Sequence, residues 1–305
     1  LFDIASSNPT QDDMKPGRCL PKQNTAVSHH RGAKKASSRQ RAKISAMRVA
    51  HLNIQSLLGN ASRGNDSHRK IDDLRCFLSG ANAPHVLCLS ETWLSSKVDT
   101  ELNVDNYTIV RRDRTGRQGG GVLMYVNQQI MFSEYKIDYS RHADIEVCAI
   151  KINPPGVKAL IICCVYRPPS SNAAWLQSFY AFLDDVSLSK HDIVLLGDFN
   201  IDLLSDDAFS SDLAVNYGLQ QIITEPTRIA KASATLIDHI YVPKAHIVSC
   251  ITVNNLHLSD HCMVSCELRR CYVQPQQDNS RSRTVHYRCI NAVDINALKA
   301  DLRSA

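Results

Sequence analysis

The sequence predicts an α/β domain with two β-sheets, and three observations support this fold class. Ten short runs rich in Val, Ile, Leu and Cys have the length and composition of strands. Only three stretches among them have the apolar spacing of helices, and they are interspersed among the strands. The chain of 305 residues is long enough to bury the core of such a domain. A simple series of βαβ units would alternate strand and helix more regularly.

The expected elements can be taken in order along the chain. Strands are predicted at 48–54, 85–89, 107–110, 121–126, 145–152, 159–166, 193–196, 236–242, 246–253 and 262–268. Helices are predicted at 67–78, 173–188 and 205–217. The run at 193–196 is apolar at every position, as in a strand buried on both faces. It ends at Gly197, where the backbone can turn without steric cost.

The composition indicates an intracellular globular protein of the nucleus and cytoplasm, with no membrane partner. Hydrophobic residues make up 44% of the chain and charged residues 21%, which is ordinary for such proteins. The longest apolar runs, such as 159–165, are too short to span a bilayer, and no signal peptide is visible at the start. Most of the eleven cysteines lie inside strand-like runs without zinc-site spacing. This usage is typical of a reduced compartment.

Charge is segregated along the chain. Residues 1–48 hold ten Lys or Arg against three Asp or Glu, and residues 269–305 hold seven against three. The stretch 49–268 holds 18 basic and 24 acidic residues. Basic flanks around an acidic centre suit a polyanion-binding protein whose core gathers carboxylates for a cation. Solvated flanks that bind nothing specific are an equally good interpretation of the flanks alone.

This distribution predicts three parts. Residues 1–46 are expected to form a disordered basic tail, because they contain few large apolar residues. Residues 47–269 are expected to form the folded domain. Residues 270–305 are expected to form a polar linker that contains a short helical pattern at 293–302. The first residue is not Met, so we expect a longer parent protein.

Polar residues lie where the expected strands end. They are Asn53, Glu91, Tyr166 with Arg167, Asp198 with Asn200, Asp238, and the run Ser259, Asp260 and His261. Asp198 and Asn200 are two apart and therefore project to the same side of an extended segment. Together these side chains provide oxygen ligands for Mg²⁺, a base for water, donors for phosphate oxygens and a histidine–carboxylate pair. This is the set that a cation-assisted phosphodiester hydrolase requires.

Each of these residues also has a purely structural interpretation. Asn53 and Asn200 could be turn residues, Tyr166 could close the edge of the core, and the pair at 198 and 200 could cap a loop. The histidines at 51, 239 and 257 are interpreted as structural. The glycines at 119–121 predict a tight turn, since no Lys-Ser/Thr pair follows them as in a phosphate-binding loop.

Eight motifs in order resemble one known superfamily. They are HLNIQSL, LCLSETWL, GGGVLMYV, VYRPP, LLGDFNIDL, EPTR, LIDHIYV and LSDH. They resemble the endonuclease/exonuclease/phosphatase superfamily, and within it the apurinic-type endonuclease domain of non-LTR (LINE-like) retrotransposons, over roughly residues 48–268. The resemblance implies a DNase I-like four-layer sandwich of two mainly antiparallel or mixed sheets with helices outside.

The resemblance also implies a metal site. Glu91 matches the Mg²⁺-binding glutamate, with Mn²⁺ as an alternative ion, and Asn53 matches the asparagine that helps to hold the metal and the phosphate. Asp260 matches a further carboxylate near the metal or at a second metal. Some repair members of the superfamily have an acid at the position of Gln55, and this chain lacks it.

The remaining roles concern water and phosphate. Asp198 would orient or deprotonate the attacking water, and Asn200 would steady that carboxylate and the phosphate. His261 would donate to a phosphate oxygen, with its tautomer fixed by Asp238, and Tyr166 would contact the scissile phosphate. Phosphate or DNA contacts are also expected from Thr227, Ser259 and Arg167.

The expected function is therefore Mg²⁺-dependent hydrolysis of one strand of double-stranded DNA. The nick would leave a 3′-hydroxyl that primes reverse transcription, and a reverse transcriptase would follow the linker. Element RNA is an expected partner through the full-length protein, and the oligomeric state stays open. Two alternatives remain: a phosphatase acting on phosphoinositide or sphingolipid headgroups, and a domesticated domain that binds nucleic acid without cutting it.

Overall fold

The computed structural model describes residues 46–269, apart from 64–65, 99, 155–157, 231–232 and 247. The basic tail expected at 1–46, except its last residue, lies outside the described residues. The linker expected at 270–305 and its helical pattern at 293–302 also lie outside them. Among the described helices, none is long and apolar enough to cross a membrane.

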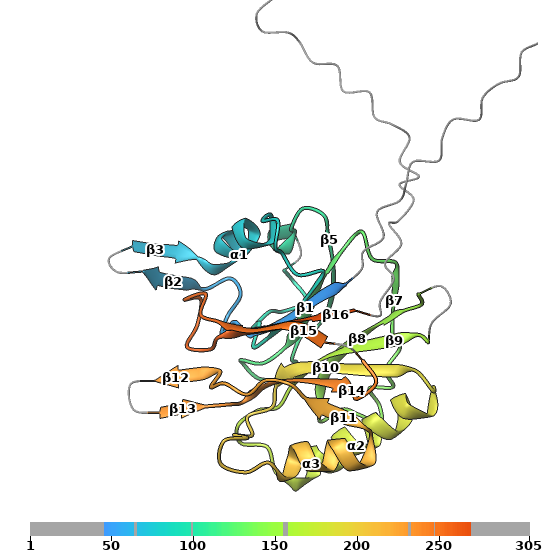
Figure 1. The fold of residues 1–305 in the computed structure, drawn as a ribbon. Helices are drawn as coiled ribbons and strands as arrows, with labels where there is room; N and C mark the ends of the chain where they lie inside the picture. Colours follow the sequence, from blue (N-terminus) through green and yellow to red (C-terminus); the bar gives the residue numbers. More distant parts are fainter. Residues whose placement is uncertain are drawn as a thin grey trace, which may run out of the picture. The chain divides into compact units, whose positions relative to one another are not determined.

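The first sheet has six strands in the order β15-β16-β1-β4-β6-β5 (Figure 1). These strands are β1 (Met47–Asn53), β4 (Val86–Ser90), β5 (Tyr107–Arg112), β6 (Val122–Asn127), β15 (Val248–Asn254) and β16 (Met263–Leu268). The pair β1 and β4 is parallel, and the other neighbours are antiparallel.

The second sheet repeats this pattern of strand directions, in the order β11-β14-β10-β9-β8-β7. Its strands are β7 (Phe132–Glu134), β8 (Glu146–Ile152), β9 (Leu160–Tyr166), β10 (Asp192–Asp198), β11 (Leu219–Gln221) and β14 (Asp238–Pro243). Here β9 and β10 are the parallel pair. Each sheet is therefore mixed, with one parallel pair at its centre.

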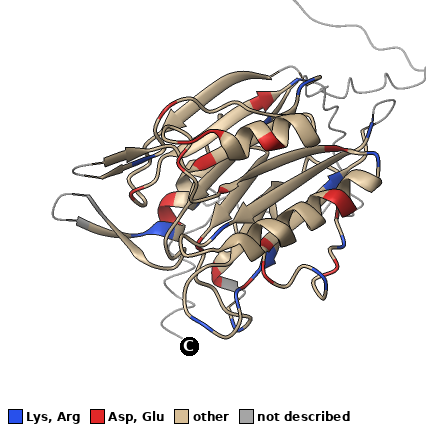
Figure 2. Cartoon of the chain, turned by 90° about the horizontal axis from the view of Figure 1, so that it is seen from below, with Lys and Arg blue, Asp and Glu red and all other residues tan. Residues whose placement is uncertain are grey.

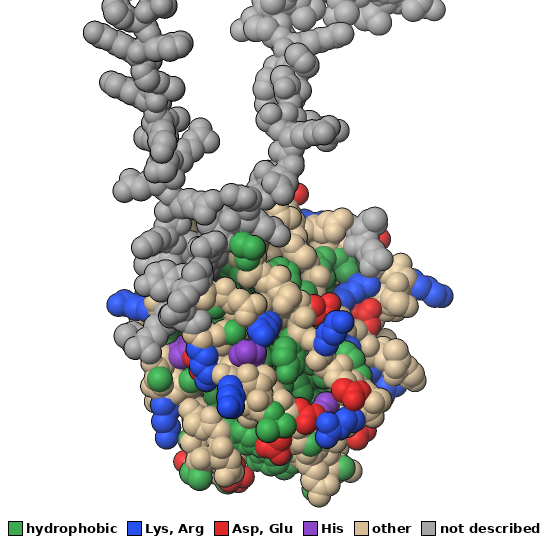
Figure 3. Space-filling view, turned by 90° about the vertical axis from the view of Figure 1, so that its right-hand side faces the viewer, with side chains coloured by type: hydrophobic (Ala, Val, Ile, Leu, Met, Phe, Trp, Pro, Cys, Tyr) green, Lys and Arg blue, Asp and Glu red, His purple; other side chains and the backbone are tan. Residues whose placement is uncertain are grey.

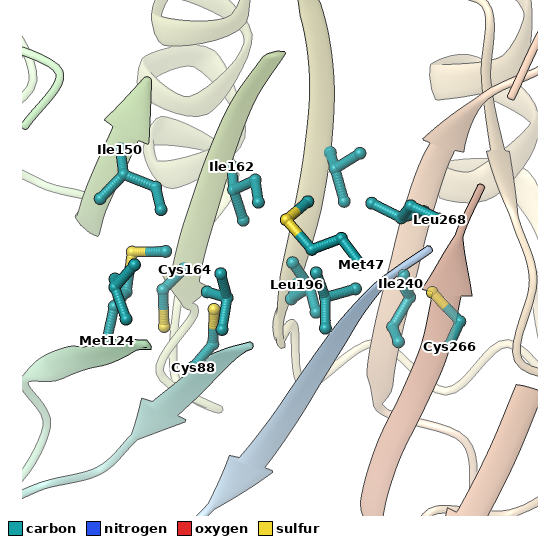
Figure 4. Packing of buried hydrophobic residues seen from close by; sticks show 14 of the residues in the cluster. Met47, Cys88, Met124, Ile150, Ile162, Cys164, Leu196, Ile240, Cys266 and Leu268 are labelled. Atoms are coloured by element: carbon teal, nitrogen blue, oxygen red, sulfur yellow. The ribbon is translucent and has the colours of Figure 1, made fainter. Parts of the chain in front are cut away.

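The two sheets pack face to face and helices cover their outer faces. Side chains from both sheets, among them Met47, Cys88, Cys164 and Leu196, point into the space between the sheets (Figure 4). Helix α1 (Lys70–Leu78) packs on the outer face of the first sheet, and the short 3₁₀ helix η1 (Thr100–Leu102) lies beside it. Helices α2 (Ala173–Leu188) and α3 (Ala208–Asn216) cover the second sheet. The expected four-layer sandwich is confirmed.

Two hairpins and the two edge strands of the second sheet, β7 and β11, were not expected from the sequence. The hairpins are β2 (Asn60–Arg63) with β3 (Asp66–Arg69), and β12 (Arg228–Ala230) with β13 (Ser233–Thr235). The expected helix at 67–78 is wrong in its first turn, because residues 67–69 pair with β2 and the helix begins at Lys70. Both hairpins project on the same side of the domain (Figure 1).

Surface charge within the domain is mixed. Acidic and basic residues are scattered over the chain in Figure 2, where helices α2 and α3 carry Asp but no Lys or Arg. The face in Figure 3 carries apolar side chains between charged ones. The acidic excess expected from the sequence for the centre of the chain therefore does not form a single patch in these views.

Candidate active site

The expected site residues meet at one end of the two sheets, where central strands of both sheets begin or end. The parallel pairs β1/β4 and β9/β10 bring the carboxyl ends of four strands to this place. Strand β14 runs antiparallel to β10, so its first residue, Asp238, pairs with the last residue of β10, Asp198. Strand β16 runs antiparallel to β1, so the turn before it carries His261 to the same place. Six strand ends from both sheets thus surround one site.

The period-two pattern of the strands explains why polar groups lie here. Along β10, Val194, Leu196 and Asp198 face the interior in succession, and the first two belong to the apolar core. Along β1 the same face passes from Val49 through His51 to Asn53. The site is therefore the polar end of the inner core, and its residues are rigidly held by strand pairing.

Asp198 is a buried carboxylate that accepts three hydrogen bonds. Its side chain is 1% exposed. Oδ2 accepts from Nδ2 of Asn53 at 2.8 Å and from Nδ2 of Asn200 at 3.2 Å, while Oδ1 accepts the backbone N–H of Asn200 at 2.9 Å. Burial, and then the negative charge of Asp238, raise the pKa of Asp198 to about 7. A carboxylate with this pKa can accept a proton from water near neutral pH.

Asp238 and His261 form a buried pair beside it. Nδ1 of His261 lies 2.8 Å from Oδ2 of Asp238, and the two side chains are 3% and 0% exposed. Burial lowers the pKa of His261, but the charge and hydrogen bond of Asp238, with Asp198 and Asp260, outweigh burial and raise it to about 9. His261 is therefore cationic at neutral pH and can donate through Nε2.

Glu91 follows β4 in the first sheet, and Tyr166 ends β9 in the second sheet. Nδ2 of Asn53 donates to Oε1 of Glu91 at 2.9 Å and so connects Glu91 to Asp198. Nε1 of Trp93 donates to Oε2 of Glu91 at 3.1 Å. Tyr166 is 3% exposed, and burial, followed by the charges of Glu91 and Asp198, raises its pKa. Its hydroxyl therefore stays protonated and remains a donor.

Asp260 closes the other side of the site. Its Oδ1 accepts from Nε2 of Gln55 at 2.5 Å, and its Oδ2 accepts from Nε of Arg228 at 2.8 Å. Nε2 of His261 is 3.8 Å from Oδ1 of Asp260. Gln55 thus places a neutral donor against this carboxylate, where an acid would place a second charge. The hydroxyl of Ser259 donates to the carbonyl of Asn53 and ties the turn to β1.

Three expected contact residues use their polar groups inside the protein. Thr227 is fully buried, and its Oγ1 accepts the backbone N–H groups of Ile237 and Asp238. The guanidinium of Arg167 donates to the carbonyls of Phe199, Asn200 and Ser171. Nδ2 of Asn200 donates to the carbonyl of Arg167 as well as to Asp198. In this structure these side chains shape the loops that follow β9 and β10 and precede β14.

Several residues of the site were not identified from the sequence. Lys70 is buried and donates to the carbonyls of Ile54 and Gln55, which fixes the loop after β1. Trp93 is 46% exposed beside Glu91. Nine described residues other than glycine have positive φ, and five of them lie at or next to the site: Gln55, Ser56, Glu91, Trp93 and Asn200. Strained backbone of this kind clusters at functional sites, but it leaves no mark in residue type.

The donor set suits a hard divalent cation. Ligand atoms of Asp198, Asp238 and His261 all lie within 4.8 Å of one another. Asp260 and Glu91 are partly exposed at the rim of the site. Carboxylate oxygens are the ligands that Mg²⁺ and Mn²⁺ prefer. Glu91 and Asp260 could hold such an ion, whereas Asn53 turns its Nδ2 toward the carboxylates and its Oδ1 toward the backbone N–H of Gln55.

The raised pKa of His261 predicts a pH-dependent stability. Protonated His261 stabilises the folded state fully below about pH 6.5, and this contribution is lost as the pH rises toward about 9. We expect the free energy of unfolding of the metal-free protein to fall by roughly 3 kcal/mol across this window from this group alone. Urea titrations at several pH values measure it. The difference from His261→Gln isolates this group, and parallel pH curves for the two proteins would contradict the assignment.

A model of the Endonuclease/Exonuclease/phosphatase family matches residues 50–261, which is more than half of the chain. The chain belongs to this family. Members of the Endonuclease/Exonuclease/phosphatase family are phosphodiester hydrolases, mostly metal-dependent nucleases or phosphatases. A comparison with curated proteins gave no match.

Solved structures of this family have the same fold. A 3′ phosphatase, NExo, from Neisseria, bound to a product DNA hairpin, is 18% identical with a TM-score of 0.54, over 73% of this chain and 99% of that one. The endonuclease domain of TRAS1, a telomere-specific non-LTR retrotransposon, is 14% identical with a TM-score of 0.53, over 73% and 98%. The catalytic domain of APE2 from Xenopus laevis is 14% identical with a TM-score of 0.56, over 76% and 94%. At these identities the likeness concerns the fold.

Proposed function

We propose that this domain is a metal-dependent DNA endonuclease that nicks one strand by hydrolysis. The observation that carries the proposal is the arrangement at this end of the sheets: buried Asp198 lies beside the Asp238–His261 pair, and Asn53 joins it to Glu91. A proton acceptor, a cationic donor and an oxygen ligand for a metal thus face one another. This is what attack of water on a phosphodiester needs.

In the proposed reaction each residue of the site would have a separate chemical role. Asp198 takes the proton of the attacking water, since its pKa near 7 keeps it an effective base. His261 donates from Nε2 to a phosphate oxygen, while Asp238 holds Nδ1 and supports the positive charge. Tyr166 donates its protonated hydroxyl to the phosphate. A Mg²⁺ or Mn²⁺ ion held by Glu91, with Asp260 near a second position, would offset negative charge on the phosphate.

We favour DNA over a lipid headgroup as the substrate. Trp93 exposes an aromatic surface at the rim, beside the residue proposed to hold the metal. Exposed aromatic rings stack on bases and sugars in nucleic-acid sites. The basic flanks of the sequence add an affinity for phosphate backbones. A phosphatase acting on phosphoinositide or sphingolipid headgroups is the second candidate, because the same catalytic set serves both.

We further propose a role in a non-LTR retrotransposon, on the strength of the eight motifs in order. The catalytic domain would then comprise residues 47–269, and the 3′-hydroxyl of the nick would prime reverse transcription of element RNA. A nuclear as well as a cytoplasmic location is part of this proposal, since the target would be chromosomal DNA.

Nicking of supercoiled plasmid tests the proposal directly. We expect conversion to open circles in Mg²⁺ and incorporation of labelled nucleotides by a DNA polymerase at the nick without prior end treatment. Sequencing of the nicks on a long duplex gives the site preference. Phosphate release from phosphoinositide or sphingomyelin vesicles without plasmid nicking would reverse the choice of substrate. DNA binding without cleavage in Mg²⁺ or Mn²⁺ would support a silent binding domain.

The proposed metal site predicts a fluorescence signal. Trp93 and the buried Trp175 are the two tryptophans of the chain. Because the indole N–H of Trp93 contacts Glu91, we expect Mg²⁺ or Mn²⁺ to change the Trp93 emission of a Trp175→Phe protein with a saturable titration. Glu91→Gln in the same background is the control, since the amide keeps the side-chain shape but loses the charge. Equal titrations in both proteins would exclude metal binding at Glu91.

A further inference from the structure

One buried histidine beneath the site is not used by the proposed mechanism. His51 lies on β1 two residues before Asn53 and is fully buried. Its side chain faces the space between the sheets, two residues farther from the end of β1 than Asn53. Ser90, at the end of β4, is level with Asn53 in the strand pairing and is also fully buried. His51 and Ser90 are thus polar residues between the apolar core and the site.

The contacts of His51 lead to the catalytic pair. Its Nε2 lies 3.1 Å from the hydroxyl oxygen of Ser90. Its Nδ1 lies 3.4 Å from Oδ1 of Asp238. Oδ2 of the same carboxylate holds His261. Asp238 therefore lies between two histidines: its Oδ1 faces His51 and its Oδ2 contacts His261.

The two atoms that face each other are otherwise unsatisfied. Nδ1 of His51 and Oδ1 of Asp238 are both buried, and neither makes a hydrogen bond of acceptable distance and angle. A buried polar atom left without a partner costs about 1–3 kcal/mol. The two atoms are 3.4 Å apart, so a small rotation of either side chain would join them in a hydrogen bond. An Nδ1–H tautomer of His51, with Nε2 accepting from the Ser90 hydroxyl, meets both needs.

We infer that His51 is a positioning residue for Asp238, a role that rests on the proposed function. The Nδ1–H group of His51 donates to Oδ1 and fixes the plane of the carboxylate. Oδ2 is then aimed at Nδ1 of His261, whose Nε2 faces the substrate. His51 does not touch the substrate itself. The contact with the Asp238 carboxylate itself favours the Nδ1–H tautomer, and the Ser90 hydroxyl can donate to Nε2 of that tautomer.

Two near-isosteric substitutions separate this role from simple filling of space. In His51→Asn the side-chain amide can occupy the place of Nδ1 and keep a donor toward Asp238. In His51→Gln the amide reaches the place of Nε2, keeps the contact with Ser90 and leaves Oδ1 of Asp238 without a donor. A merely structural histidine would tolerate the second change at least as well as the first.

Nicking kinetics on one fixed duplex in Mg²⁺ provide the first measurement. We expect His51→Gln to lower kcat roughly 10- to 100-fold with KM unchanged, as for groups that orient catalytic ligands, and His51→Asn to stay within about threefold of the unchanged protein. Ser90→Ala is the matched control, with an expected loss of only a few-fold. A loss in Ser90→Ala as large as that in His51→Gln, or unchanged kcat in His51→Gln, would overturn the inference.

A second measurement does not depend on activity. The Nδ1–H proton of His261, hydrogen-bonded to Asp238, should give a strongly downfield ¹H NMR signal in the metal-free protein. We expect this signal in the unchanged protein, His51→Asn and Ser90→Ala, and its shift or loss in His51→Gln. Urea midpoints show which variants remain folded. If the unchanged protein fails to nick DNA, the proposed function fails, but this spectrum still decides the role of His51. An identical signal in His51→Gln would refute it.

Discussion

Replacing Asp198 by asparagine is expected to lower the nicking rate by about a thousandfold, because the proton acceptor for water is lost. The same change should leave the protein as stable as before or more stable above pH 7. A buried carboxylate whose pKa is raised by burial and by Asp238 destabilises the fold when it ionises. The neutral amide removes this repulsion, which offsets the loss of one acceptor, since an Nδ2 at the place of Oδ2 cannot accept from Nδ2 of Asn53 or Asn200. Plasmid nicking and urea midpoints measure the two effects.

The control for this prediction is Asp105→Asn, which alters an exposed carboxylate at the start of β5. It should change neither rate nor midpoint. Loss of stability in Asp198→Asn equal to its loss of activity would indicate a structural role for this carboxylate. Nicking at the unchanged rate would contradict its catalytic assignment.

Replacing Gly197 by alanine is expected to have the largest effect on stability. A Cβ at this position would lie 2.1 Å from the carbonyl oxygen of Val165 on the neighbouring strand β9. The obstacle is backbone in the centre of a sheet, so it cannot rotate away as a side chain could. Overpacking of this kind costs about 1–3 kcal/mol, and more where the backbone must move. We expect a large fall in the urea midpoint and loss of nicking.

Gly218→Ala separates this clash from ordinary strain. Gly218 has φ of 66° but no atom within 4 Å of an added Cβ, so only the left-handed backbone opposes the change. We expect a cost of about 1–2 kcal/mol and unchanged nicking at temperatures where the variant is folded. A smaller destabilisation in Gly197→Ala than in Gly218→Ala would show that β9 and β10 can separate without cost.

The sequence identified the strands that carry the site because their apolar runs are strong and end in polar residues. The strands closed by Asn53 and Tyr166 were expected to within one residue of their ends, and the strand closed by Asp198 to within two. The hairpins were missed because their strands are only three or four residues long. The segments NASR and DSHR carry no alternation that predicts β-structure.

The inward role of some site residues could not be predicted for a different reason. Whether Thr227, Arg167 or His51 faces substrate or backbone depends on contacts distant in sequence. Nδ2 of Asn53, for example, reaches Asp198 across 145 positions. Residue type specifies what such a side chain can donate or accept, but the packing of the two sheets decides where it does so.

The pairing of β1 with β16 has a consequence for the order in which the protein is made. Asn53 contacts Ser259 across 206 positions, and Gln55 contacts Asp260 across 205. At ribosomal speeds of about 5–20 residues per second, the first strand waits roughly ten to forty seconds for its partner. Until the last strand has left the ribosome, Glu91 and Asp198 lack His261. A nascent or prematurely terminated chain therefore lacks part of the proposed centre, and under the proposed function translation itself limits when cleavage can begin.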